Sequence, residues 1–368
     1  MCRSSITDNN ECGCLLLQYE VRIKLTVFNV LNKQQLKSHP VLPVQVWRGE
    51  VKESEHLVHA VLVDESRQVV ASWGDSAYKT TARSALKPFQ LLSNLTNGAS
   101  EKFQFTEQEL AFMCASHNGE SMHTDLCLSL LQKIGQGEQN LLCGSHDPYH
   151  QESAIKLYQQ QKKPTAIHNN CSGKHCGMLA HASLVPSSLS YLDREHPTQQ
   201  GIFNLLAELL GKEKPIKWGT DGCSLPTPEL YLSELAYLFT CLAAGQCKEQ
   251  KQYSMLKDIF LAMSNHPHLV AGQGRFDTAF MNFAAGAAVC KVGGEAIRGF
   301  ALRLPEGSFG LVVKVQDGAM RALHPACLQL CIQLGILNEE DLSKELKAFL
   351  KGQTFNWANR LATHILFG

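Results

Sequence analysis

The alternation of hydrophobic and polar residues changes along the chain and divides it into strand-rich ends and a helical middle. Runs of β-branched residues separated by polar turns predict strands at residues 44–47, 57–63 and 68–72. A second group of strands is predicted at residues 286–291, 296–304 and 309–315. Between the two groups, apolar residues recur at the 3.6-residue spacing of helices in residues 120–134, 151–161, 198–211, 227–244 and 251–264.

Capping patterns mark two of the predicted helix starts. Thr106 and Glu109 form a capping box before an apolar run, and Thr227 followed by Pro228 matches an N-cap with proline at the first helical position. Two further helices are predicted at residues 321–335 and 339–351. Because strands at both ends flank a helical core, the order favours an α+β fold, with one antiparallel sheet built from both ends of the chain and helices beside it.

Residues 1–40 differ in pattern from the rest of the chain. Hydrophobic and polar positions alternate over residues 19–31, and residues 32–36 form a polar, helix-like piece. These features predict either an extra strand or an unstructured extension. We therefore divide the chain into an N-terminal extension, 1–40, and a single domain, 41–368, whose helical middle covers about residues 100–285.

Composition and charge exclude several classes of partner. The 368 residues are 44% hydrophobic and 18% charged, as in ordinary globular proteins. With 34 basic and 34 acidic residues, the chain has no net charge that would attract nucleic acid or an anionic membrane. No apolar run reaches the roughly 18 residues that a membrane span needs.

The 14 cysteines bear on the cellular compartment. Their spacing is irregular and includes no Cys-x-x-Cys pair, and the chain is too long to need disulfide staples. Residues 1–15 contain Asp8 and Glu11 where a secretion signal would have an apolar core. We therefore expect reduced thiols in a cytoplasmic protein.

The richest chemistry lies in the segment His168-Asn-Asn-Cys-Ser-Gly-Lys-His-Cys-Gly-Met178, which we interpret as a loop. It collects two thiols, two imidazoles and an amine without any acid, and Gly173 and Gly177 allow close approach of its backbone. A second turn, Gly219-Thr-Asp-Gly-Cys-Ser-Leu-Pro-Thr-Pro228, adds another thiol. These residues predict a metal site, an active site or both; the alternative is a half-buried connecting loop. From ligand chemistry alone, an ordinary closed zinc site would use Cys171, His175, Cys176 and Cys223.

Candidate nucleophiles come from Ser-x-x-Lys patterns, in which a neutral lysine can accept the serine proton. Only one of the three copies follows a turn and stands at the start of a predicted helix; the other two lie in helices rich in Gln and Lys. The copies are Ser84–Lys87, Ser153–Lys156 and Ser254–Lys257. The first copy therefore predicts a reactive serine, with a plain helix cap as the alternative.

Two more segments offer catalytic groups. Ser116, His117 and Asn118 follow an apolar helix, and Lys291 ends a strand before two glycines. A polar turn and a hairpin with a solvated lysine are the simpler interpretations. In chain order, however, Ser-x-x-Lys, Ser-x-Asn and Lys-x-Gly reproduce the three-part layout of penicillin-binding proteins and serine β-lactamases.

Four segments together carry a specific resemblance. They are Arg83-Ser-Ala-Leu-Lys-Pro-Phe-Gln90, Cys114-Ala-Ser-His-Asn-Gly-Glu120, His168-Asn-Asn-Cys-Ser-Gly-Lys-His175 and Asp221-Gly-Cys-Ser-Leu-Pro-Thr-Pro-Glu229. They resemble the signature segments of the class 3 L-asparaginase family, also called the asparaginase II family. The resemblance covers about Val44 to Gly318, whereas residues 1–40 and 356–368 depart from it.

The resemblance implies a serine β-lactamase-like fold and hydrolysis of L-asparagine to L-aspartate and ammonia, in a homodimer. It implies two catalytic pairs, Ser84–Lys87 and Ser116–Lys291. It implies a zinc ion bound by Cys171, Lys174, Cys223 and a water molecule. The substrate-contacting residues that it implies are Arg83, His117, Asn118 and Asp221.

Two other functions fit the same residues. One is a non-catalytic protein that binds a small amide and keeps a structural zinc, and an ammonia assay with asparagine separates it from an enzyme. The other is a β-lactamase-like acyl hydrolase. A comparison of asparagine, glutamine and penicillin as substrates separates that activity from an asparaginase.

Overall fold

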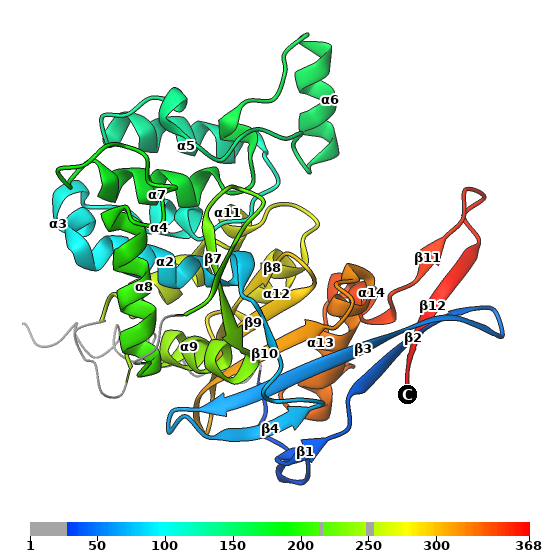
Figure 1. The fold of residues 1–368 in the computed structure, drawn as a ribbon. Helices are drawn as coiled ribbons and strands as arrows, with labels where there is room; N and C mark the ends of the chain where they lie inside the picture. Colours follow the sequence, from blue (N-terminus) through cyan, green and yellow to red (C-terminus); the bar gives the residue numbers. More distant parts are fainter. Residues whose placement is uncertain (1–27, 213–215, 248–253) are drawn as a thin grey trace, which may run out of the picture.

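A computed structural model describes residues 28–212, 216–247 and 254–368, and Figure 1 shows their fold. A large sheet occupies the lower part of the molecule in this view, and a layer of helices from the middle of the chain stands above it. The alternating pattern at residues 19–27 and the predicted helix start at 251–253 lie outside the described residues.

The large sheet has nine strands in the described part of the chain and is antiparallel except for the β1–β4 pair. Its main path runs β11-β12-β2-β3-β10-β9-β8, and β4 pairs with β3. The strands are β1 (Ser38–His39), β2 (Leu42–Arg48), β3 (Val51–Asp64), β4 (Val69–Trp73), β8 (Ala288–Gly293), β9 (Ile297–Leu304), β10 (Gly307–Val315), β11 (Thr354–Phe355) and β12 (Leu361–Phe367). The pairing of β3 with β10 confirms that one antiparallel sheet joins strands from both ends of the chain.

The helices fill the middle of the chain and its last third, and none in the described residues is long and apolar enough to cross a membrane. The middle contributes η2 (Arg83–Leu86), α2 (Lys87–Asn94), α3 (Ser100–Phe103), α4 (Glu107–Met113), α5 (Ser121–Lys133), α6 (Gln151–Gln159), α7 (Ser172–Ala182), α8 (Pro197–Leu210), α9 (Leu232–Ala244), α10 (Met255–Asn265), α11 (Pro267–Val270) and α12 (Phe276–Ala284). Helices α13 (Met320–Gln333) and α14 (Lys344–Lys351) follow the strands.

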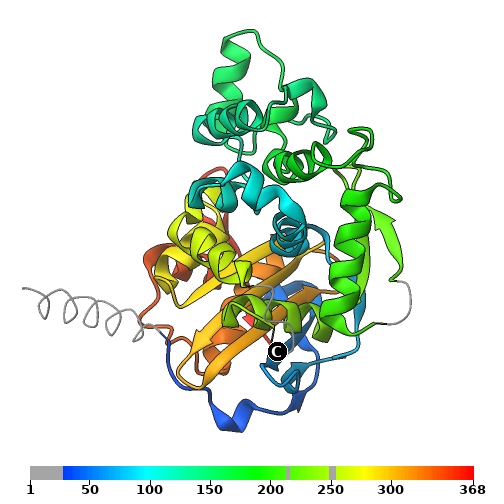
Figure 2. The same ribbon diagram turned by 90° about the vertical axis from the view of Figure 1, so that its left-hand side faces the viewer.

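Helices cover both faces of the sheet, as the two views in Figures 1 and 2 show. On one face, α9 packs against β3, β9 and β10, and a Cβ added to Gly310 would lie 1.8 Å from the carbonyl oxygen of Ala236 in α9. Neighbouring side chains of a strand point to opposite faces. Phe300 of β9 is therefore directed away from α9, and its ring packs against Phe280 of α12, with centroids 4.9 Å apart. The sheet is consequently buried on both sides.

A small second sheet, in the order β5-β7-β6, overturns one predicted helix start. It consists of β5 (Lys79–Thr81), β6 (Trp218–Thr220) and β7 (Pro226–Tyr231). Thr227 and Pro228 belong to β7, and the Thr227 hydroxyl accepts a hydrogen bond from the Arg83 backbone N–H at 3.1 Å. Because β5 and β6 pair with the backbone here, the helix begins only at Leu232. The capping box predicted at Thr106 and Glu109 is confirmed at the start of α4.

The segment His168–Met178 is largely a buried helix, so its interpretation as a loop is wrong. Helix α7 begins at Ser172, and all of its residues are buried. Gly173 explains how a helix fits there: a Cβ at this position would lie 2.1 Å from the Phe112 carbonyl oxygen of α4. The close backbone approach predicted for Gly173 is confirmed, and it sets the separation of α4 and α7.

The sequence pattern also misses β12, which pairs with β2 from His364↔Trp47 to Phe367↔Val44. The hairpin of β11 and β12 lies beside the long hairpin of β2 and β3 and extends away from the helical layer (Figure 1). Leu361 and Leu366 on β12 are exposed, so this strand does not show a clean alternation that the hydrophobic pattern could reveal.

Replacing Gly173 with alanine should destabilise the fold, because the added methyl group meets backbone atoms of α4 that cannot turn aside. We expect the free energy of unfolding, measured with urea, to fall by about 3 kcal/mol. Gly219→Ala is the matched control, since a Cβ there meets only a Thr227 methyl group at 3.9 Å. Equal stability of the two variants would contradict the close packing of α4 and α7.

Candidate active site

Two lysine amines approach one serine hydroxyl in the interior of the protein. Ser116 Oγ lies 3.0 Å from Lys87 Nζ and 2.7 Å from Lys291 Nζ. Lys87 begins α2, Ser116 follows α4, and Lys291 lies in β8. Both lysines are 0% exposed and Ser116 is 7% exposed. The fold thus brings three segments far apart in sequence to one buried hydroxyl.

Neither amine has a carboxylate partner. Lys87 Nζ also contacts the backbone carbonyl oxygens of Ala115 and Asn170 and the Cys171 thiol, and Lys291 Nζ donates to the Val292 carbonyl oxygen at 2.8 Å. No ion pair within the described residues includes either lysine. Burial without a counterion disfavours the charged form. It lowers the pKa of both lysines, and the positive charge of Lys87 helps to bring the pKa of Lys291 down to about 7.

The predicted pairing of Ser84 with Lys87 is not formed. In the described residues Lys87 bonds to Ser116, and no hydrogen bond joins it to the Ser84 side chain. Ser84 and Lys87 lie on one tight turn of helix, and the Lys87 side chain extends from this turn into the interior, past α4. Ser84 instead lines the cavity beside Arg83. Arg83 itself has φ of 48°, a left-handed conformation that non-glycine residues adopt infrequently.

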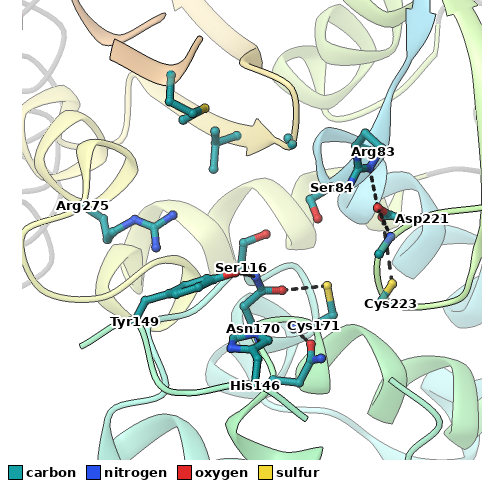
Figure 3. A pocket seen from close by; sticks show the side chains of 16 residues that line it. Arg83, Ser84, Ser116, His146, Tyr149, Asn170, Cys171, Asp221, Cys223 and Arg275 are labelled. Carbon is teal, nitrogen blue, oxygen red and sulfur yellow. Dashed lines mark hydrogen bonds and ion pairs between the residues drawn. The ribbon is translucent and has the colours of Figure 1, made fainter. Parts of the chain in front are cut away.

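A cavity of about 400 Å³ lies in front of Ser116 (Figure 3). Its walls come from the start of η2, the end of α4, the start of α7, the turn after β6 and the end of β8. Six of the residues predicted from the sequence line it, namely Arg83, Ser84, Ser116, Cys171, Asp221 and Cys223. The volume suits a small organic molecule, and the hydroxyl between the two amines is accessible from it.

Thiols and an amine gather at one wall of this cavity. Lys174 Nζ lies 2.9 Å from Cys223 Sγ. The Cys171 thiol contacts Cys223, and this hydrogen bond lowers the pKa of Cys171 well below its usual value. Burial acts to lower the pKa of Lys174, but the neighbouring thiols and carboxylate raise it, so this amine can bind a metal only after it loses its proton. In that state two thiolates and one amine meeting at a point fit a zinc ion. In the described residues, no group of three or more His, Cys, Asp or Glu side chains forms a metal site.

The closed four-ligand zinc site considered from the sequence does not form. Cys176 turns away from the cavity, with its sulfur 3.6 Å from that of Cys127 in α5. His175 bonds through Nδ1 to the Tyr191 hydroxyl at 3.0 Å. Because Cys176 and His175 are consecutive with Lys174 on a helix, their side chains spread around its axis, and only Lys174 faces Cys223.

A comparison with protein families identifies the chain from residue 44 to residue 366 with the family described as "L-asparaginase II". The chain belongs to the L-asparaginase II family. The match begins after the N-terminal extension and includes the four segments that carry the resemblance seen in the sequence, which is confirmed.

Solved structures give weaker similarity, and a comparison with curated proteins found no match. One structure, described as "Crystal Structure Analysis of Mglu in its native form", has 14% identity and a TM-score of 0.42, with 76% of this chain and 64% of that chain covered. Another, of Mglu "in its tris and glutamate form", has 13% identity and a TM-score of 0.42, with 88% and 67% covered. This chain thus spans 64% of the length of the first structure.

Two residues expected to contact substrate in the L-asparaginase II family do not line the cavity. His117 is fully buried; its Nε2 lies 2.9 Å from Ser172 Oγ, and its Nδ1 accepts the Gly119 N–H at 3.0 Å. Asn118 donates to the Gln273 carbonyl oxygen and accepts from Arg275, both at 2.9 Å. Their side chains tie α4 to α7 and to the loop before α12.

Among the cavity residues that were not predicted as site residues, five have polar side chains: His146, Tyr149, Asn169, Asn170 and Arg275. Three of them bond to one another, because the Asn170 N–H donates to His146 Nε2 at 2.9 Å and its amide donates to the Tyr149 hydroxyl at 3.0 Å. Asn170 lies within residues 168–175, one of the four segments that carry the family resemblance. The signal for Arg275 was the pair of glycines, Gly272 and Gly274, just before it.

The two ionic groups at the far wall, Asp221 and Arg83, form an ion pair. Burial acts to raise the pKa of Asp221, but the positive charges of Lys174 and Arg83 outweigh it and hold the pKa below its usual value. Behind Lys291, Asp277 accepts from Arg298 Nε and from the Val292 N–H, each at 2.9 Å. This buried ion pair fixes the end of β8 that carries Lys291.

The buried amine of Lys291 should make stability depend on pH. Its pKa of about 7 in the folded protein lies below the value of about 10.4 expected in the unfolded chain. Between these values the unfolded chain binds the extra proton, so stability rises with pH. We expect the free energy of unfolding of the wild type, minus that of Lys291→Met, to rise by up to about 1.4 kcal/mol per pH unit between pH 7.5 and 9.5.

Urea unfolding at several pH values measures this difference, and the subtraction removes groups common to both proteins. Lys102→Met changes an exposed lysine and should give no such slope. Parallel curves for the wild type and Lys291→Met would contradict a neutral amine at this position.

Proposed function

We propose that this protein is an amidohydrolase that cleaves the side-chain amide of L-asparagine to L-aspartate and ammonia, with Ser116 as the nucleophile. The observation that carries the proposal is the convergence of Lys87 and Lys291 on the Ser116 hydroxyl. A serine attacks an amide only if a neighbouring base takes its proton. An amine with a pKa near 7 is half neutral at physiological pH, which suits it to this task.

In this mechanism Lys291 is the general base. The Ser116 O–H proton passes to the neutral Lys291 amine as Oγ bonds to the amide carbon of the substrate. The Lys291 ammonium then donates that proton to the departing nitrogen, the C–N bond breaks, and ammonia leaves. A water molecule attacks the resulting ester, gives a proton to Lys291 and releases aspartate, and Ser116 regains its proton.

Lys87 has a different role in the same cycle. Its Nζ is held by the Ala115 carbonyl oxygen as well as by the Ser116 hydroxyl, an arrangement typical of a donor with several N–H groups. A positive charge here favours the alkoxide-like oxygen that forms as Ser116 loses its proton. It also disfavours a second charge on Lys291, so the two lysines divide the roles of cation and base.

The cavity walls can orient the substrate. Asp221 offers a carboxylate to the α-ammonium group, and Ser84 offers a hydroxyl close to it. A glutamine side chain is longer by one methylene, which is worth about 1–3 kcal/mol in a pocket that discriminates by shape. We infer that asparagine is preferred, because a longer side chain displaces the amide carbon from Ser116 when its ammonium stays at Asp221.

Zinc is part of the proposal. Cys171, Cys223 and a neutral Lys174 would hold the ion, and because the two thiolates would cancel most of its charge, the ion when bound would mainly anchor the wall next to Asp221. The zinc ligands would also join two segments of the cavity wall, because Cys171 directly precedes α7 and Cys223 lies in the turn after β6. Holding both would keep Asp221 and Asn170 at the cavity.

Substituting the two serines separately tests the choice of nucleophile. Ser116→Ala should lower kcat for ammonia release from asparagine by about a thousandfold or more, as expected for loss of a nucleophile. Ser84→Ala should lower it roughly tenfold, the effect of one lost hydrogen bond to substrate. An enzyme-coupled ammonia assay measures both, with circular dichroism to confirm folding.

A larger loss in Ser84→Ala than in Ser116→Ala would contradict Ser116 as the nucleophile. Wild-type protein that binds asparagine but releases no ammonia would instead support the rival function, a small-amide binding protein. Faster cleavage of penicillin than of asparagine would support the β-lactamase-like alternative.

Metal content tests the zinc ligands without any measurement of activity. We expect about one zinc ion per chain in the purified wild type and clear loss of zinc in Cys171→Ser and Cys223→Ser, measured by plasma mass spectrometry. Cys241→Ser, which changes a buried cysteine at the end of α9, should retain the ion. Equal zinc content in all four proteins would contradict the assignment.

A further inference from the structure

Among the charged side chains of the cavity, one lacks an ionic partner. Arg83 and Asp221 neutralise each other, but Arg275 forms no ion pair within the described residues. Its guanidinium bonds to the neutral amide of Asn118 and lies over the Tyr149 ring, 5.9 Å from the ring centre. The nearby Asp277 carboxylate is already paired with Arg298. The cavity therefore presents one uncompensated cation.

We propose that Arg275 binds the α-carboxylate of the substrate and so restricts turnover to side-chain amides of free α-amino acids. The inference rests on the proposed function and deepens it by naming the substrate class. Simple aliphatic amides and amides whose α-carboxyl is in a peptide bond lack the group that Arg275 would bind.

The position of Arg275 fits this role. In Figure 3 its guanidinium points into the cavity from the side opposite Arg83 and Asp221, with Ser116 between them. A free amino acid carries a carboxylate and an ammonium on one carbon, and the side-chain amide branches from it. The Arg275 guanidinium on one wall, the Asp221 carboxylate on the other and the nucleophile between them match these three groups.

The loop that carries Arg275 is built to hold it. The Asn118 amide binds both the guanidinium and the Gln273 carbonyl oxygen, each at 2.9 Å. Glu120 accepts the Gln273 N–H at 2.8 Å, and its other oxygen lies 2.9 Å from His268 Nε2. Gly272 has φ of +113°, and a Cβ there would lie 2.4 Å from the Glu120 carboxylate. Asn118, Glu120 and Gly272 thus act as positioning residues for the arginine.

A partly buried arginine without a counterion is costly unless a ligand neutralises it. Burial lowers the pKa of Arg275, although a guanidinium stays charged at neutral pH. Its planar group binds a carboxylate through two parallel hydrogen bonds, which an ammonium cannot reproduce. A bound carboxylate would supply the missing charge.

The test compares asparagine with 3-aminopropanamide, which is asparagine without its α-carboxylate. Ammonia release is measured for the wild type, Arg275→Gln and Arg275→Lys. We expect Arg275→Gln to lower kcat/KM for asparagine by roughly 100-fold, mostly through KM, and to change it for 3-aminopropanamide by less than about threefold. Arg275→Lys keeps the charge but loses the two parallel bonds, so it should lie between.

The matched control is Arg360→Gln, which changes an exposed arginine in the β11–β12 hairpin and should leave both rates unchanged. An equal loss for the two substrates in Arg275→Gln would show a structural role and overturn the inference. Unchanged kinetics with asparagine would overturn it as well.

Binding of L-aspartate, followed by titration calorimetry, decides the inference without turnover. We expect the Kd to rise by about 100-fold in Arg275→Gln and to stay constant in Arg360→Gln. A wild type that binds aspartate through Arg275 but releases no ammonia would defeat only the proposed hydrolysis. Ammonia release with no effect of Arg275 on either measurement would defeat only the carboxylate site.

Discussion

Two buried amines that share one hydroxyl, with no carboxylate to balance them, are the constraint on which the site depends. Water would solvate both ammonium groups and leave the serine an ordinary alcohol. The protein interior removes that option, because desolvation favours loss of a proton and each amine repels charge on the other. The sheet, α2 and α4 are all needed to impose this environment on Ser116.

The same packing joins the nucleophile to the thiol cluster. Gly173 lets α7 approach α4 until backbone nearly touches backbone, and the bond from His117 to Ser172 holds the two helices in register. Cys171 and Lys174 lie at the start of α7, so this contact also sets where the thiols stand relative to Ser116. His117 therefore supports the site by holding α7 against α4, and its side chain does not line the cavity.

Much of the fold follows from the local sequence pattern. The spacing of apolar residues differs between strands and helices, and a short segment is enough to distinguish the two. The pairing of early strands with late ones could also be inferred, since neither group alone makes a complete sheet. Thr227-Pro228 misled because its residues are typical of a helix start, yet they lie in the central strand of the small sheet, and only the neighbouring strands β5 and β6 decide. β12 was missed because its exposed leucines blur the alternation.

The residues of the site were easier to predict than their contacts. The segments around Ser84, Ser116, Cys171 and Cys223 are distinctive in composition, and the structure brings all four to one cavity. Spacing could not show that Lys87 reaches past Ser84 to Ser116, since that depends on how α2 crosses α4. Arg275 carries no local motif beyond two glycines, and its importance appears only when the charges of the assembled cavity are counted.

The order of these segments in the chain has a consequence during synthesis. Lys291 is separated by 175 residues from Ser116, and it sits in a strand that pairs with β9, which is made later still. A nascent chain that has emerged only as far as α12 has the serine and the first amine but lacks the second. In the proposed mechanism, Ser116 therefore lacks its base until β8 has been translated and has paired with β9.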